Sequence, residues 1–232
     1  MAVRLFLVLL LACAGCRSID RDLVERTKRE LTKALEKGRR HEGPPQAGAS
    51  IPVPWTKGQF AVWGITQGEY TTLTEAQVEE ADENGFIVMM TIVSPRQRTT
   101  ARLTFSEQPH SRDEARDFLT QVIRRRGDER AYTYRFHRDM RVDMRDSLEP
   151  LWATLVPHPV QGEPGTAATY AATMEGCIPG QGQFIHSPLG LKFKEAWLHP
   201  AVPINGLVLG KAQSGETVEL IDSGWSGGGP AL

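Results

Sequence analysis

The chain has 232 residues, of which 24% are charged, with 27 lysines and arginines against 28 aspartates and glutamates. This near-neutral balance excludes the strongly basic class of nucleic-acid-binding domains, and no nucleic-acid partner is predicted. The three cysteines include two close to the N-terminus and Cys177, so we predict no disulfide framework and expect Cys177 to be a buried small hydrophobic residue.

Residues 1–16 have the composition of a secretory signal. Arg4 precedes an apolar run of residues 5–11 and a site of small residues that ends in Cys16. The run is too short for a membrane-spanning helix, which needs about 20 apolar residues. This pattern resembles the lipobox of bacterial lipoproteins, and the resemblance implies a diacylglyceryl thioether on Cys16. Cys13 is the alternative lipidation site, and an ordinary signal peptide is a further alternative.

The resemblance also implies where the protein resides. Neither candidate cysteine is followed by aspartate, which is the usual signal for inner-membrane retention. The expected location is therefore the cell envelope, as an outer-membrane lipoprotein that faces the periplasm. The protein would be anchored to its membrane by the N-terminal lipid.

Residues 17–54 are predicted to tether the folded domain to this anchor. Residues 19–40 have a narrow apolar stripe and several oppositely charged pairs at i,i+4 spacing, which is typical of a charged helix. The helix is either a stalk that binds a partner or a solvated spacer. The stretch that follows is rich in proline and glycine and is predicted to be an unstructured linker.

Residues 55–232 are predicted to form a single β-rich domain. Strands expected at residues 59–66, 70–80, 86–93 and 98–105 make an antiparallel meander, with a hairpin turn ending at Gly85. In the second strand, alternation places Thr74, Ala76 and Val78 on one face. The polar residues Glu75 and Gln77 fall on the other face, which we expect to be exposed to solvent.

One amphipathic helix is predicted at residues 111–126 to cover a face of this sheet. Ser111 and Glu114 form a capping box at its start, and apolar residues then recur at i, i+3, i+4, i+7 and i+8. These residues are Ala115, Phe118, Leu119, Val122 and Ile123. Residues 124–126 are three arginines, which either complement the helix dipole or bind a phosphate or an acidic partner.

The second half of the domain is predicted mostly as strands. A strand is expected at residues 132–136, a short helix at 148–156, and further strands at 166–174, 183–186, 191–199, 207–212 and 217–222. Leu191, Phe193 and Trp197 mark the inward face of the strand at 191–199. The fold class is thus α+β and predominantly antiparallel β, a curved sheet or half-barrel with one covering amphipathic helix, preceded by the tether helix.

The segment 197–208 resembles one found in uncharacterised envelope lipoproteins of Gram-negative bacteria. There, a strand that carries tryptophan runs into a Pro-x-Val-Pro corner, here residues 200–203, before Gly206. The corner is predicted to be structural, because proline lacks an amide donor and Asn205-Gly206 permits left-handed backbone. The domain also loosely resembles the curved sheet of periplasmic lipoprotein carriers, which implies a concave site for an apolar ligand.

No catalytic, metal or cofactor site is predicted. The string at residues 224–228 matches a nucleophile elbow, but only four residues follow, so the acid and histidine of a hydrolase are missing. The six histidines are scattered, without an i,i+4 pair or a neighbouring CxxC motif.

The sequence is compatible with three functions. The first is binding of an apolar ligand, a lipid or a lipoprotein segment, by Phe118, Leu119, Val122, Phe193 and Trp197. The second is docking of an envelope protein without any ligand pocket, and the third, with least support, is a hydrolase. An apolar cavity between sheet and helix favours the first, whereas an exposed apolar patch or an open strand edge favours the second.

Overall fold

The computed structural model describes Asp22, Glu25 and Arg29 and residues 54–68, 70–136, 143–169, 173–180, 185–186 and 190–225. The predicted signal sequence, with Cys13 and Cys16, lies outside the described residues, as does most of the predicted tether. The three N-terminal residues named above are helical and exposed.

The predicted meander is present from its first strand to its fourth. The strands are β1 (Gln59–Gln67), β2 (Tyr70–Asp82), β3 (Gly85–Val93) and β4 (Arg98–Phe105), each paired antiparallel to the next. In β4, buried residues alternate with partly exposed ones, as the period of two requires. The turn between β2 and β3 closes where Asp82 pairs with Gly85, so the hairpin prediction is confirmed.

Within residues 54–225, the described helices are short and lie between strands. They are α3 (Arg112–Phe118), α4 (Asp143–Asp146), α5 (Glu149–Trp152) and the 3-10 turn η1 (Ala153–Leu155). The remaining strands are β5 (Leu119–Arg126), β6 (Tyr132–Arg135), β7 (Gly165–Ala168), β8 (Thr173–Pro179), β9 (Ile185–His186), β10 (Leu191–Leu198), β11 (Leu207–Ala212) and β12 (Thr217–Trp225).

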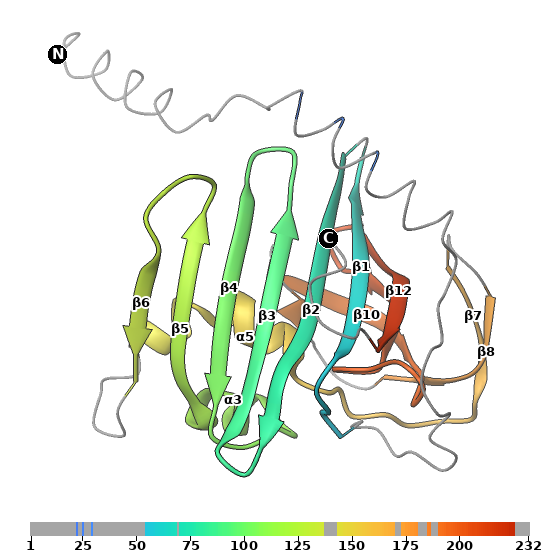
Figure 1. Cartoon of the computed structure of the whole chain (residues 1–232). Helices are drawn as coiled ribbons and strands as arrows, with labels where there is room; N and C mark the ends of the chain where they lie inside the picture. The colour runs from blue at the N-terminus through green and yellow to red at the C-terminus, as the bar shows by residue number, and fades with distance from the viewer. Residues whose placement is uncertain are drawn as a thin grey trace, which may run out of the picture.

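The twelve strands of the described residues form one antiparallel sheet. Its order is β6-β5-β4-β3-β2-β1-β12-β11-β10-β8-β7, with β9 paired to β10. The pairing of β1 with β12 joins the two ends of the described domain. The sheet is curved and unclosed, and α3 and α5 lie behind β2 to β5 on its concave side in the view of Figure 1.

The prediction of a covering helix at residues 111–126 is wrong beyond residue 118. Ser111 caps α3 by accepting a hydrogen bond from the backbone nitrogen of Glu114 at 3.2 Å, as predicted, but the helix ends at Phe118. Residues 119–126 instead form β5 and pair with β4 from Thr99 to Phe105. Thr120, Val122 and Ile123 are β-branched and favour strand, and β5 supplies the backbone partners that the edge of β4 needs.

The prediction that one face of β2 is exposed to solvent is also wrong. Glu75 is 1% exposed and Gln77 is 5% exposed, so both polar side chains are buried. Glu75 lies between Val62 of β1 and Thr91 of β3 in the register of the sheet. Alternation of polarity shows that a strand has two unlike faces, but it does not show that the polar face is open to solvent.

Two strand predictions in the second half need correction. The single strand expected at residues 166–174 is divided into β7 and the start of β8. In β10, the register shifts between Phe193 and Glu195, which places Ala196 and Leu198 in the core and leaves Trp197 only partly buried. A bulge of this kind reverses the facing of the side chains that directly follow it, so Trp197 does not share the inward face of Phe193.

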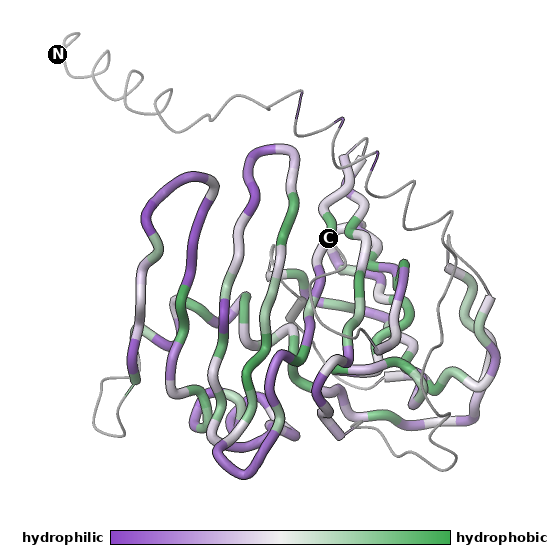
Figure 2. The backbone as a smooth tube through the Cα atoms, in the orientation of Figure 1, coloured by the Kyte–Doolittle hydropathy of each residue, from purple (hydrophilic) through white to green (hydrophobic). Residues whose placement is uncertain are grey.

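A single hydrophobic core connects the sheet with the short helices. Trp63 and Trp152 are the largest fully buried side chains, and the core continues into both halves of the sheet. Figure 2 shows hydrophilic backbone at the hairpin turns, including the turn between β5 and β6, and hydrophobic backbone along the middle of the strands.

Candidate functional site

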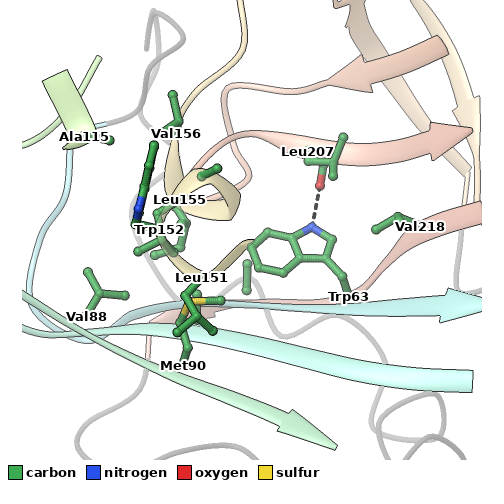
Figure 3. Close-up of a cluster of buried hydrophobic side chains, with 14 of the residues drawn as sticks. Trp63, Val88, Met90, Ala115, Leu151, Trp152, Leu155, Val156, Leu207 and Val218 are labelled. Atoms are coloured by element: carbon green, nitrogen blue, oxygen red, sulfur yellow. Dashed lines mark hydrogen bonds between the residues drawn. The ribbon is translucent and has the colours of Figure 1, made fainter. Parts of the chain in front are cut away.

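The concave face of the sheet is filled by the protein's own side chains. Leu151, Trp152 and Leu155 project from α5 and η1 into this face, where Trp152 lies near Val88 and Met90 (Figure 3). Each of these five residues is at most 5% exposed. The place where a half-barrel would hold an apolar ligand is thus occupied in this conformation.

Small side chains on the sheet make room for these bulky ones. Ala61 pairs with Ala76, which pairs with Met90, which pairs with Ala101, so three alanines fall in one register row across four strands. Each of these four side chains is at most 1% exposed. Large residues on the helices therefore face small residues on the sheet, which is how close packing is reached without voids.

We call residues 143–156, which carry α4, α5 and η1, the plug segment. Two ion pairs tie it to α3, one between Arg112 and Glu149 and one between Arg116 and Asp146 at 3.4 Å. Both pairs are partly exposed, and ion pairs at the surface contribute about 0–1 kcal/mol each. Most of the stability of the plug segment must come from the burial of its apolar side chains.

A corner at residues 199–207, buried from residue 202 onward, connects the plug segment to the sheet. The side-chain amide of Asn205 donates to the carbonyl of Thr154 at 2.7 Å, and its oxygen accepts from the backbone nitrogen of Leu207 at 2.9 Å. The indole of Trp55 donates to the carbonyl of Ile204 at 3.0 Å. Ile204 adopts a φ of 72°, which is rare for a β-branched residue. These contacts support the structural interpretation of this corner.

The five residues predicted to bind an apolar ligand do not line one open surface. Leu119, Val122 and Phe193 are at most 1% exposed and belong to the core. Phe118 and Trp197 are partly buried and pack against that core from outside. In the sheet order, six strands separate β5 from β10, so the two groups of residues come from distant parts of the sheet.

The arginines at residues 124–126, for which phosphate binding was one alternative in the sequence, lie beside an aromatic residue that sequence reasoning missed. Arg124 and Arg126 lie on β5, and Tyr132, which is 59% exposed, lies opposite Arg124 on β6. The arginines were visible in the sequence, but their placement on a predicted helix hid the pairing with Tyr132. Burial lowers the pKa of Arg124, and the positive charge of Arg126 lowers it further.

The other reactive side chains that the structure describes are buried or separate. His158 is 7% exposed, and burial lowers its pKa to about 3, so it is neutral at physiological pH. Cys177 is fully buried, and its thiol donates to the carbonyl of Met174 at 3.4 Å. Among the described residues, no three histidine, cysteine or acidic side chains gather into a metal-binding group.

Residues 226–228 of the predicted nucleophile-elbow string lie outside the described residues. Within the described part of the chain, no helix is long and apolar enough to cross a membrane. Comparisons of the chain with protein-family models, with curated proteins and with solved structures find no significant match.

Proposed function

We propose that this chain is a lipid-anchored envelope protein of a Gram-negative bacterium, and that its folded domain docks another envelope protein. The N-terminal lipobox-like sequence supports the anchor, and the filled concave face supports a function at the surface. Trp152 and Leu155 are each at most 1% exposed, and they occupy the interior that a bound lipid would need. This observation carries the proposal.

The edge strand β6 supports the location of docking. It pairs with β5 on one side, and no described strand pairs with its other side. Three of its four residues are exposed. An edge of this kind offers backbone donors and acceptors to an extended segment of a partner, which adds to the sheet as a further strand.

Site-specific photo-crosslinking in the cell envelope tests this proposal. The full chain carries p-benzoylphenylalanine in place of Tyr132, and the matched control carries it in place of Tyr70, which is 42% exposed at a hairpin on another part of the sheet. We expect one discrete protein adduct at position 132 and none at position 70. The same adducts at both positions, or none at position 132, would contradict docking at β6.

Binding of an apolar ligand is the second candidate, because the plug segment covers an apolar concave face. The buried side chains Leu148, Leu151, Trp152 and Leu155 contribute roughly 1.5–3 kcal/mol each, and a buried methylene about 0.8 kcal/mol. An acyl chain of about ten methylenes would therefore match what the plug segment contributes. This function requires the plug segment to leave the concave face when a lipid enters.

A further inference from the structure

Arg124 is an arginine on the apolar side of a sheet. Val122 is buried in the core, and the period of two places Arg124 on the same face of β5. Its partner in β4 is the buried Ala101, and its partner in β6 is Tyr132. The next residue, Arg125, points to the opposite, convex face and is exposed. A guanidinium on the concave side of a core strand requires an explanation.

One donor of the Arg124 side chain has no partner in the fold. Its Nε atom is buried, yet no described residue accepts a hydrogen bond from it. Arg145 also has a buried Nε without a hydrogen bond, but its guanidinium lies 5.3 Å from the ring centre of Phe136 in a cation–π contact. A buried donor without a partner costs about 1–3 kcal/mol, so Arg124 lowers the stability of the fold.

The surroundings of Arg124 add positive charge. Arg126 follows two residues later on the same face, about 7 Å along the strand. Burial is the main cause that lowers the pKa of Arg124, and Arg126 lowers it further, whereas Tyr134 and Glu129 raise it, with Glu129 the weaker of the two. Two cations near one another on one face are repelled unless an anion lies between them. The exposed Tyr132 brings a hydroxyl group to the same end of the sheet.

We infer that Arg124, Arg126 and Tyr132 form a binding site for a phosphate group. Arginine presents its donors in a planar fork that pairs with two phosphate oxygens, and the hydroxyl of Tyr132 supplies a donor for a third oxygen. The phosphate neutralises the two guanidinium groups and relieves their mutual repulsion. This site does not depend on the docking function proposed above, because it requires only the concave corner of β5 and β6.

Titration of the mature full chain in a non-ionic detergent tests the site and its source of phosphate. One arm uses inorganic phosphate, and the other uses dihexanoyl phosphatidylglycerol, with dihexanoyl phosphatidylcholine as the zwitterionic comparison. The variants are Arg124→Gln and Arg126→Gln. The matched control is Arg125→Gln, which removes the same charge from the same strand but on the convex face. Binding is measured by calorimetry at low salt.

We expect saturable binding of at least one of the two phosphate probes, weakened at least tenfold by Arg124→Gln and less than twofold by Arg125→Gln. Binding of inorganic phosphate identifies a free phosphate, and binding of phosphatidylglycerol alone identifies a lipid headgroup. The melting temperature of Arg124→Gln without a probe should be equal to or higher than that of the parent chain. The proposal would be overturned if neither phosphate probe bound, or if Arg124→Gln and Arg125→Gln lost affinity equally. A marked loss of stability in Arg124→Gln would overturn it as well.

Discussion

The indole nitrogen of Trp63 donates a hydrogen bond to the carbonyl oxygen of Leu207 at 3.0 Å, and both residues are fully buried. Trp63 lies in β1, and Leu207 opens β11 directly after the buried corner. The bond thus connects residues 144 positions apart in the sequence. It fixes the corner against the centre of the sheet, next to the plug segment.

Substitution of Trp63 by phenylalanine tests this bond. Trp63→Phe keeps a large ring in the core but leaves the Leu207 carbonyl without this donor and removes part of the packed volume. We expect the free energy of unfolding to fall by about 2–4 kcal/mol, measured by urea denaturation. The control is Trp225→Phe, which removes an exposed bond to Thr56 of 3.3 Å and should cost less than about 1 kcal/mol. Equal effects would show that the bond to Leu207 is unimportant.

The amide of Asn205 should be among the most sensitive polar groups of the fold. Asn205→Ala leaves both the Thr154 carbonyl and the Leu207 nitrogen without their side-chain partner in a buried site. We expect a loss of about 2–4 kcal/mol in the free energy of unfolding. Asn84→Ala, at an exposed hairpin turn, is the matched control and should change it by about 0.5 kcal/mol or less. A neutral Asn205→Ala would mean that the corner does not hold the plug segment.

Gly85 should tolerate no side chain. It has a φ of +123°, and a Cβ atom there would lie 2.2 Å from the carbonyl oxygen of Phe105. We expect Gly85→Ala to destabilise the domain by about 3 kcal/mol, from backbone strain and this clash. Gly68→Ala also introduces a side chain at positive φ, but no atom lies within 4 Å, so it should cost about 1 kcal/mol. Thermal unfolding of the two variants compares the two effects, and similar melting temperatures would contradict this account.

His158 should make stability depend on pH. Burial lowers its pKa from 6.5 to about 3, so the unfolded chain binds a proton between these values while the folded chain does not. The contribution of the neutral His158 to stability is therefore fully present above about pH 6.5 and is lost as the pH falls toward 3. At pH 5 this loss amounts to about 2 kcal/mol. His158→Gln should remove this part of the difference between pH 7 and pH 5. The exposed His110→Gln is the control, and an identical pH dependence in both variants would refute the role of His158.

The meander was predictable because its signals are local. Alternation in residues 98–105 and the turn ending at Gly85 each depend on only a few adjacent residues. The failure at residues 119–126 has a different origin. Ala115, Phe118 and Val122 satisfy a helical period, yet the free edge of β4 requires a strand there, and this requirement comes from tertiary structure.

The candidate site was less predictable than the fold. The pairing of Arg124 with Tyr132 follows only after β5 and β6 are known to be neighbouring strands. The burial of Phe193 agrees with its predicted inward position. The bulge after it reverses the face on which Trp197 lies, which the alternation did not predict. A bulge inserts one residue into the ladder without a clear sequence signal, so the facing of later residues is not readable from alternation.

The most direct test of the central claim is native mass spectrometry of residues 51–232, which contain every strand of the sheet. The fragment is produced in a bacterial periplasm and examined without detergent. Our account, in which Trp152 and its neighbours fill the concave face, predicts the bare mass of the chain with no lipid bound. One lipid molecule per chain, released when the protein is denatured, would contradict this account and make the apolar-ligand function the leading one.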